Sequence, residues 1–326
     1  MIEKSKVNKA RVKDKPYLGD NDFWRIRNMI SETKPITPVG FNWEVRRWDG
    51  WRFYNSSPDW DSRRNKTVRL WETDKGKLVG AVHPEGSGNA HIQIHPDYRY
   101  IEDKIIIWAE QNLAMSVKNS RPQLRFFIHE NDSYRRNLLK RRGYIKTGGG
   151  EVTRRLCFKN NPVPQPEMAN GYSMRSTRPD DIDDCQQIAD LLNAAFNRNF
   201  HVAEEFHFFA KYAPCYQNDL NLVAVAPDGT FAAYVGAPYD EINKCGIFEP
   251  DCTHPAHQRK GLARSLMLEA LHRLKNIGAS EVLVGTGEGM AANRLYESIG
   301  FAQVYKSSQW KRIIYVPSAD EIFHLA

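Results

Sequence analysis

Residues 253–267 read THPAHQRKGLARSLM and carry the most informative local pattern in the chain. A strand is predicted to end here, a proline interrupts it, and a turn containing Gly261 opens a long helix with an apolar face. The small residues Gly261 and Ala263 would let a bulky anion approach the backbone amides of the first helical turn. Three flanking side chains add positive charge: Arg259, Lys260 and Arg264. The pattern predicts a phosphate or pyrophosphate cradle. The alternative is an ordinary strand–helix turn with solvated basic residues.

The chain around this stretch, from residue 172 onward, predicts alternating strands and helices. Hydrophobic periodicity and turn residues predict strands at 172–175, 220–226, 230–235, 246–253 and 281–284, with two more within 301–316. Helices are predicted at 182–196, 204–212, 261–276 and 290–299. Because consecutive hairpins alternate with helices, the expected fold class is α/β with a mixed central sheet flanked by helices.

The first half of the chain repeats this order. Strands are predicted at 68–72, 77–82, 89–95, 124–129 and from 144 onward, with helices at 104–117 and 132–142. His95-Pro96 precedes one long helix as His254-Pro255 precedes the other, and Gly143-Tyr144 parallels Gly300-Phe301. The sequence therefore predicts an internal repeat of two similar domains.

Charge and proline content place the boundary between these domains. Residues 1–160 hold 32 Lys+Arg against 19 Asp+Glu, a net charge of +13, whereas the remainder holds 14 against 20, a net charge of −6. The change falls at residues 159–171, KNNPVPQPEMANG, whose prolines disfavour helix. We expect domains at 1–160 and 171–326, joined by a linker at 161–170.

Composition excludes several classes of protein. Hydrophobic residues make up 41% and charged residues 26%, the profile of a soluble globular protein. No apolar run reaches the roughly 18 residues of a membrane helix, and the basic N-terminus lacks the apolar segment of a secretory signal. The five cysteines form no C-x-x-C pair. A cytoplasmic protein without membrane contact, disulfides or a structural metal is expected.

Two segments resemble a known family. Gln258, Gly261 and Ala263 match the Q/R-x-x-G-x-G/A motif A of the GCN5-related N-acetyltransferases (GNAT), and residues 291–301, AANRLYESIGF, are similar to its motif B. The element order from 172 to 316 also resembles this fold. The resemblance implies two tandem GNAT-like domains, of which the second is an acetyl-CoA-dependent N-acetyltransferase.

The same resemblance implies roles for individual residues. The pyrophosphate of acetyl-CoA would lie on the backbone of residues 259–264, including Leu262, beside Gln258. The pantetheine arm would pair with the backbone of Asp251, Cys252 and Thr253, and Asn293 matches a position that often bonds this arm. Tyr296 matches the usual general acid, and a phenol can protonate a thiolate whose thiol pKa is about 8–9. The alternative for Tyr296 is a core aromatic.

Glu249 is the candidate general base. An amine attacks a thioester only in its neutral form, so a proton acceptor is needed. Strand alternation would place Glu249, Asp251 and Thr253 on one face, and a carboxylate within an apolar strand is costly unless it is used or paired. A water chain as the base, or a structural hydrogen bond or salt bridge for Glu249, are the alternatives.

The first half departs from the family pattern where the chemistry would occur. Alignment of the two His-Pro pairs places Glu102 and Lys104 at the small positions of motif A, and Leu139 at the position of Tyr296. A carboxylate in the anion site and no phenolic acid predict a degenerate copy that does not bind acetyl-CoA.

Other patterns are given less weight. Residues 285–289, GTGEG, lack the third glycine of a dinucleotide loop and are interpreted as a flexible loop. A metal site among Cys245, Cys252, His254 and His257 is not expected, and His201 and His207 are interpreted as lining or core residues. A basic helix face with a tryptophan-rich segment could suggest nucleic-acid contact, but solvation and core packing explain it better. Its members are Arg135, Arg136, Lys140, Arg141, Arg142, Trp43, Trp48, Trp51, Tyr54 and Trp60.

The sequence thus predicts an N-acetyltransferase that uses acetyl-CoA and a primary-amine acceptor. Carboxylates of the acidic second half suggest a cationic acceptor, because a cleft of one charge concentrates ligands of the other. These candidates are Glu204, Glu205, Asp240, Glu241 and Asp251. The alternative function is a non-catalytic acyl-CoA sensor whose basic first domain binds nucleic acid or an acidic partner.

Overall fold

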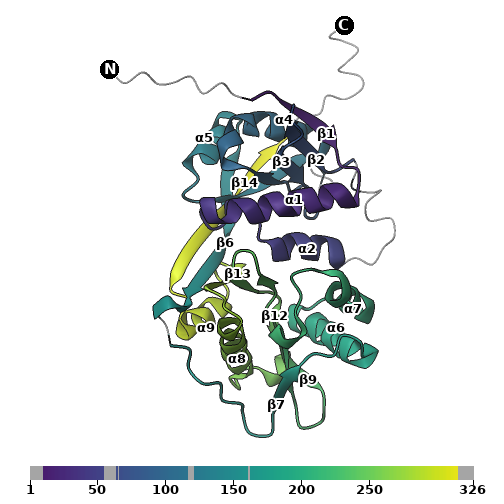
Figure 1. Ribbon diagram of the computed structural model, residues 1–326, viewed down its shortest axis with the longest axis vertical. Coiled ribbons are helices and arrows are strands. Elements are labelled where there is room, and N and C mark those ends of the chain that lie inside the picture. Colours follow the sequence, from purple (N-terminus) through teal and green to yellow (C-terminus); the bar gives the residue numbers. More distant parts are fainter. Residues whose placement is uncertain (1–9, 55–63, 65, 117–120, 161, 315–326) are drawn as a thin grey trace. The chain divides into compact units, whose positions relative to one another are not determined.

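The computed structural model describes residues 10–54, 64, 66–116, 121–160 and 162–314. These described residues divide into two compact units (Figure 1). The first unit takes them from residues 1–42, 61–148 and 308–326, and the second from 43–60 and 149–307. No helix in the described part of the chain is long and apolar enough to cross a membrane.

The first unit contains a four-stranded antiparallel sheet in the order β1-β2-β3-β4. Its apolar core includes Ile105 and Ile106 from α4, Phe126 from β5 and Leu139 from α5. The bounds of the elements are β1 Val12–Pro16, α1 Asp20–Thr33, β2 Arg69–Thr73, β3 Leu78–His83, β4 His91–Ile94, α4 Glu102–Asn112, β5 Gln123–His129 and α5 Ser133–Arg141. Short 3-10 turns occupy Lys34–Ile36 and Pro96–Ile101.

The second unit holds an antiparallel sheet in the order β12-β9-β8-β7. Its members are β12 Asp251–Thr253, β9 Phe231–Gly236, β8 Asn221–Val225 and β7 Ser173–Ser176. The apolar side of α8, Leu262–Asn276, packs on this sheet through Leu266 and Met267. The helices α6, Ile182–Phe196, and α7, Ala203–Tyr212, contribute to a separate cluster with β9.

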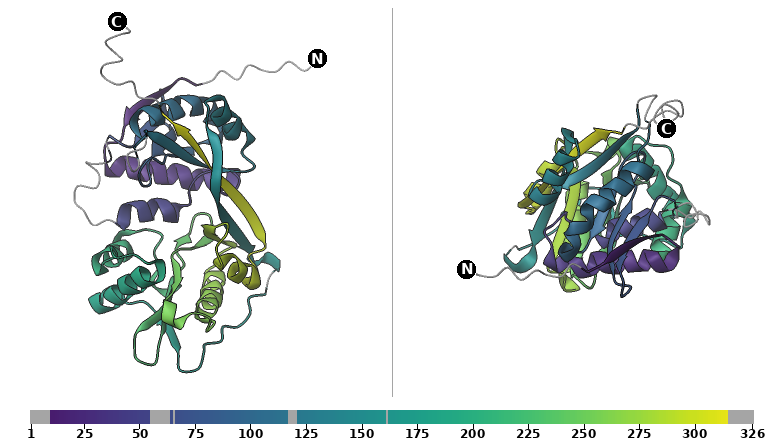
Figure 2. Two further views of the ribbon diagram at one scale, coloured as in Figure 1. Left: turned by 180° about the vertical axis from the view of Figure 1, so that it is seen from behind. Right: turned by 90° about the horizontal axis from the view of Figure 1, so that it is seen from above.

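A six-stranded sheet runs in the order β10-β11-β13-β6-β14-β5, and β5 belongs to the first unit. The strands are β10 Tyr239–Asp240, β11 Cys245–Phe248, β13 Glu281–Gly287, β6 Ile145–Cys157 and β14 Gln303–Ile313. β11 pairs with β13 in parallel, and β13 pairs with β6 antiparallel. Figure 2 shows β6 and β14 side by side. α9, Ala292–Ile299, precedes β14. This sheet is therefore mixed in direction, as the sequence predicted for the central sheet.

The units do not divide at the linker predicted from proline content and charge. β6 and β14 each begin in one unit and end in the other, and α2, Val45–Phe53, belongs to the second unit although it comes from the first half of the chain. The difference arises because a composition change reports a chain segment, whereas a compact unit is defined by packing between segments distant in sequence.

Most predicted elements lie within a few residues of those observed, but several expectations need correction. The strand predicted at 246–253 is two strands, β11 and β12, in different sheets. The two closing strands within 301–316 are one strand, β14, among the residues described, with residue 316 outside them. The predicted loop at 285–289 continues β13 through Gly287. The helix predicted at 104–117 spans Glu102–Asn112, and residue 117 lies outside the described part.

The internal repeat is visible in detail at the two His-Pro pairs. The Nδ1 atom of His95 accepts a hydrogen bond from the amide of Asp97 at 3.3 Å, and that of His254 accepts one from Ala256 at 3.2 Å. Each histidine therefore caps a short 3-10 turn before a long helix. The two turns differ in how they connect to that helix, since only the second has a glycine in the left-handed conformation at the helix start.

Candidate active site

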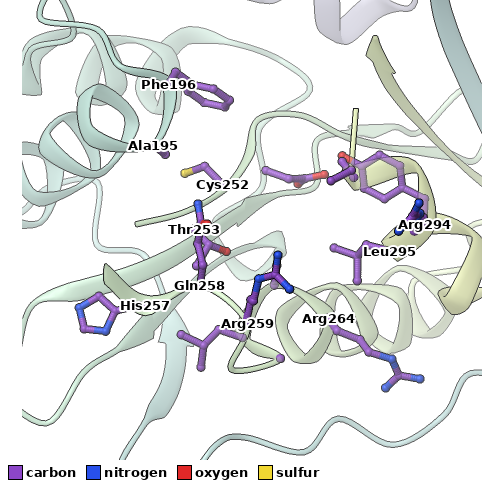
Figure 3. Close-up of a pocket in the computed structure, with 17 residues that line it drawn as sticks. Ala195, Phe196, Cys252, Thr253, His257, Gln258, Arg259, Arg264, Arg294 and Leu295 are labelled. Carbon is purple, nitrogen blue, oxygen red and sulfur yellow. The ribbon is translucent and has the colours of Figure 1, made fainter. Parts of the chain in front are cut away.

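A cavity of about 600 Å³ opens in the second unit (Figure 3). It is lined by β12, the loop and first turn of α8, the first part of α9 and the end of α6. Its lining residues are Ala195, Phe196, Asp251, Cys252, Thr253, His257, Gln258, Arg259, Gly261, Leu262, Ala263, Arg264, Ala291, Ala292, Arg294, Leu295 and Tyr296.

The cavity lies where the parallel pairing of β11 and β13 ends. β11 and β13 pair in parallel up to Phe248 and Val284. The chain then passes Glu249 and Pro250, and β12 pairs with β9 instead. Backbone groups beside β12 therefore face an open space rather than the next strand, which suits a ligand that pairs along a strand edge.

The start of α8 has the conformation of an anion cradle. Arg259 and Gly261 both adopt the left-handed region, with φ of 62° and 76°. A Cβ built at Gly261 would have no heavy atom within 4 Å, so the space beside this backbone is open. Arg259 directs its guanidinium toward the middle of the cavity, whereas that of Arg264 points away along the helix (Figure 3). The local geometry fits a phosphate-bearing ligand.

The cavity brings together most of the predicted site residues. Ten of them line it, from three separated segments of the chain: Asp251, Cys252, Thr253, Gln258, Arg259, Gly261, Leu262, Ala263, Arg264 and Tyr296. Strand alternation would have turned Cys252 away from Asp251 and Thr253, yet all three line the cavity. Cys252 is nevertheless buried, whereas Asp251 and Thr253 are half-buried.

Two predicted cofactor ligands and the predicted base lie outside the lining. The Nζ atom of Lys260 lies 5.8 Å from the Tyr172 ring centre. The Asn293 amide donates to three carbonyls of the preceding loop, at Gly287, Glu288 and Met290, and its Oδ1 accepts from Arg154. The protein itself thus uses the Asn293 side chain to fix the start of α9.

Tyr296 is held on α9 at the cavity wall. Its ring is buried, with 6% of the residue exposed, and packs edge-on to Phe301 at a centroid distance of 6.2 Å. Burial, followed by the negative charges of Asp251 and Glu249, raises the pKa of the Tyr296 phenol. The phenol therefore keeps its proton throughout the neutral range and can donate it.

Asp251 is the most unusual ionisable group in this cavity. Both of its carboxylate oxygens are buried, and neither has a hydrogen-bond partner among the described residues. Burial, followed by the charge of Glu249, raises the pKa of Asp251 well above its usual value, while Arg46 opposes the change. A buried, unsatisfied carboxylate is costly, and such groups mark functional sites. The sequence assigned Asp251 a backbone contact with the cofactor arm and a place among the acceptor-side carboxylates, but no role in proton transfer.

Glu249 lies two residues away in a different environment. Its side chain is 49% exposed and forms an ion pair with Nη1 of Arg46 at 3.5 Å. The Nε of Arg46 also donates to the backbone carbonyl of Glu249 at 3.2 Å. The salt bridge that the sequence left open as an alternative is therefore present, and Glu249 is not among the residues that line the cavity.

Several cavity residues were missed by sequence reasoning. Phe196 and Ala195 come from the end of α6, and Arg294 and Leu295 flank Tyr296 on α9. The motif-B segment offered a signal for the latter pair, since both residues lie within 291–301 next to Tyr296. No local signal identifies Arg46, which is 203 residues from Glu249.

The remaining candidates have structural partners. The Nδ1 of His207 faces the Pro179 carbonyl at 2.7 Å, and that of His201 faces Glu205 at 3.1 Å. No group of three or more potential metal ligands occurs within the described ranges. The tryptophans Trp43, Trp48 and Trp51 lie in the second unit and the basic helix α5 in the first, while Trp60 lies outside the described residues.

The first unit has a different arrangement at the corresponding helix start. Glu102 is fully buried, and its carboxylate accepts from Arg99 at 2.5 Å and from Arg135 at 2.8 Å. Arg99 also donates to both oxygens of Asp132. A cavity of about 260 Å³ lies beside Arg99 and Asp132, less than half the volume found in the second unit. The carboxylates of Glu102 and Asp132 therefore already pair with the arginines at this helix start.

Comparison with known proteins finds a family match within part of the chain. Residues 185–301 match the acetyltransferase (GNAT) family. This stretch is similar to a GNAT domain. It contains the cavity, both motif segments and Tyr296. No curated protein sequence matches the chain.

Solved structures share the fold over nearly the whole chain. A GCN5-related N-acetyltransferase from Sphaerobacter thermophilus is 14% identical, with a TM-score of 0.64, and covers 94% of this chain and 97% of its own. A tandem GNAT protein from the clavulanic acid biosynthesis pathway is also 14% identical, with a TM-score of 0.65 over 94% and 100%. A GNAT-family acetyltransferase from Colwellia psychrerythraea reaches 0.57 at 11% identity, over 92% and 99%. The fold is therefore that of tandem GNAT proteins.

Proposed function

We propose that the protein is an acetyl-CoA-dependent N-acetyltransferase whose second unit transfers the acetyl group to a primary amine. The observation that carries the proposal is the pairing of an open anion cradle with two buried proton-handling groups, Asp251 and Tyr296, along one cavity. A simple binding site would not need an unsatisfied carboxylate at this position.

The lining residues fit the parts of acetyl-CoA. The amides around Gly261, with Arg259 and Arg294, would hold its phosphates, and the edge of β12 would hold the pantetheine arm. The cosubstrate supplies a thioester, whose carbonyl carbon accepts an amine nucleophile. The chain's own residues would orient both reactants and exchange protons with them.

Two side chains divide the proton transfers. Asp251 would accept the proton that the amine loses, because its raised pKa makes the carboxylate a stronger base than an ordinary aspartate. Tyr296 would donate its proton to the departing sulfur. Glu249, the base predicted from the sequence, would act as the second carboxylate next to Asp251.

Separate variants decide which carboxylate accepts the proton. Asp251→Asn should lower kcat/KM by about 100-fold or more, the usual contribution of a general base. Glu249→Gln should retain more activity if it acts through Asp251. A complete loss in Glu249→Gln with an active Asp251→Asn would restore Glu249 as the base.

The acceptor is proposed to be a cationic amine. Two of the carboxylates that suggested a cationic acceptor have structural partners instead. Asp240 accepts a hydrogen bond from Asn243, and Glu205 faces His201. Asp251 and Glu249 remain beside the cavity. The apparent second-order rate for a steered cation should fall steeply with ionic strength. A flat salt response would contradict a cationic acceptor.

The test of the function is release of CoA thiol from acetyl-CoA across a panel of amines. Release that depends on an added amine, and that falls about 100-fold in Tyr296→Phe, is the expected result. Tyr212→Phe, at an exposed site on α7, serves as the matched control and should behave as the wild type. Saturable CoA binding without turnover of any amine would instead favour the acyl-CoA sensor.

A cytoplasmic location also stays part of the proposal. None of the five cysteines forms a disulfide in the described parts of the chain, which supports a reducing environment. The first unit is proposed to be a degenerate copy that does not bind acetyl-CoA, because Glu102 and its arginines fill the anion position.

A further inference from the structure

Arg46 is a buried cation that the second unit receives from the first half of the chain. It lies on α2, and its side chain is 7% exposed. Burial of a guanidinium is expensive unless it is paired and hydrogen-bonded. Packing alone does not account for its place beside Glu249, because an apolar side chain would fill the same volume at lower cost.

The contacts of Arg46 fix both the backbone and the side chain of Glu249. Its Nε donates to the Glu249 carbonyl at 3.2 Å, and its Nη1 lies 3.5 Å from the Glu249 carboxylate. The first contact sets the path of the chain immediately before Asp251. The second places a positive charge next to the Glu249 carboxylate, two residues before Asp251 in the chain.

The aromatic surroundings hold the guanidinium in this orientation. Its central carbon lies 5.3 Å from the ring centre of Tyr54 and 5.6 Å from that of Phe209, and these two rings stack at 4.2 Å. The backbone also makes room for it, since a Cβ built at Gly50 would lie only 2.6 Å from Nη1 of Arg46. Both features restrict the position of the Arg46 guanidinium.

We propose that Arg46 is a positioning residue for the acetyl transfer: it holds Glu249 in place, and its positive charge makes the neighbouring Asp251 able to ionise and accept the amine proton. This inference rests on the proposed function. It assigns α2 a role in proton transfer that neither motif of the domain provides.

The charged and titratable groups around this segment come from several elements and loops. Arg46 is influenced by Glu249, Tyr54, Cys215 and Tyr234. Asp251 is influenced by Glu249 and Arg46, and it affects in turn the ionisation of Cys252 and Tyr296. Arg46 is the positive member of this set, so its charge favours the ionised form of Asp251, whereas that of Glu249 opposes it.

These charges predict the direction in which each substitution shifts the titration of Asp251. Arg46→Gln removes the cation, so Asp251 should ionise at higher pH and the acidic limb of kcat/KM should move upward by about one pH unit or more. Glu249→Gln removes a neighbouring anion and should move the same limb downward. Arg46→Lys keeps the charge and should restore most of the wild-type profile. A purely structural role would not produce shifts of opposite sign.

The experiment measures these variants in two ways. The first is the pH profile of kcat/KM, and the second is carbon-detected NMR titration of the Asp251 carboxyl in the protein without substrates. The upward shift in Arg46→Gln, its reversal in Arg46→Lys and the downward shift in Glu249→Gln are expected in both. Unchanged titration of Asp251 in a folded Arg46→Gln protein overturns the inference.

The two readouts separate this inference from the proposed function. If no amine is acetylated, the function fails, while the NMR titration still decides the role of Arg46. If Arg46→Gln does not fold, Gly50→Ala replaces it, because the added Cβ displaces the guanidinium without removing its charge. That variant must also shift the Asp251 titration upward, and the absence of a shift overturns the inference.

Discussion

Asp251 and Cys252 are adjacent residues of β12 that line the same cavity. The Asp251 carboxylate is proposed to accept a proton, whereas the Cys252 thiol stays protonated. The Asp251 carboxylate is buried without a hydrogen-bond partner in the described structure, so it gains reactivity at the expense of stability. Burial, followed by the charge of Asp251, raises the pKa of the Cys252 thiol to about 12. A neutral thiol is a poor nucleophile.

Asp251→Asn should therefore stabilise the protein, and by an amount that grows with pH. The pKa of Asp251 is raised on folding, so its favourable contribution is fully present below the unfolded pKa and is lost as pH rises through the folded pKa. The gain in unfolding free energy should reach about 1–3 kcal/mol at alkaline pH and vanish in acid. Thermal unfolding across pH measures it. A gain that is the same at every pH would contradict the assignment.

Cys252→Ser should leave the transfer rate within about threefold of the wild type, because a thiol with a pKa of about 12 does not form the thiolate needed for an acyl-cysteine intermediate. Mass spectrometry after incubation with acetyl-CoA alone should find no acetylated Cys252. A loss of activity in the variant, together with an acetyl adduct on the wild-type thiol, would indicate transfer in two covalent steps.

The candidate phosphate site at the start of α8 comes from one short segment, which contains Gly261, the first amides of the helix and two arginines. Gly261→Glu should lower CoA affinity by about 10- to 100-fold, because it adds a carboxylate where charge-assisted hydrogen bonds would form. Calorimetry is the measurement. Gly278→Glu is a matched control, since Gly278 also has positive φ and open space but lies beyond the far end of the same helix. Equal losses in both variants would point to folding rather than to the cradle.

The elements of the second half were largely predictable from the sequence. The long helix at α8, the hairpin of β8 and β9, and the order of the remaining strands follow from local periodicity and turns. The cradle and the place of Tyr296 on the cavity wall follow from the two motif segments.

Other features could not be predicted, for physical reasons. The interpretation of 246–253 as one strand assumed that alternation continues through Pro250, whereas the chain changes sheets at Glu249 and Pro250. α1 was overlooked although Phe23, Ile26 and Ile30 recur at helical spacing, whereas α2 is assigned to the second unit by packing alone. Arg46 was missed because a contact across 203 residues leaves no trace in a local pattern.

At the scale of the whole molecule, two related units have diverged at the same point of the fold. The second keeps an open glycine turn before α8, whereas the first buries Glu102 between Arg99 and Arg135 at the start of α4. Ligand binding to the first unit would require these internal ion pairs to break, which costs several kcal/mol when one buried partner is lost.

The protein should consequently bind one CoA per chain. Isothermal titration with CoA should give a stoichiometry of one, and Gly261→Glu should weaken that single binding event. A stoichiometry of two, or a binding event whose affinity Gly261→Glu leaves unchanged, would show that the first unit is a functional site despite Glu102.

β6 begins in one unit and ends in the other, and α2 belongs to the second unit although it comes from the first half of the chain. Both features limit where the gene can be divided without disrupting a unit. A product encoded from residue 171 onward would lack the strand that pairs with Glu281–Gly287 of β13, leaving a long unpaired edge of the kind that promotes aggregation. It would also lack Tyr54, which covers the Phe209 ring. Recombination at the proline-rich segment would therefore separate two gene fragments, neither of which encodes a complete unit.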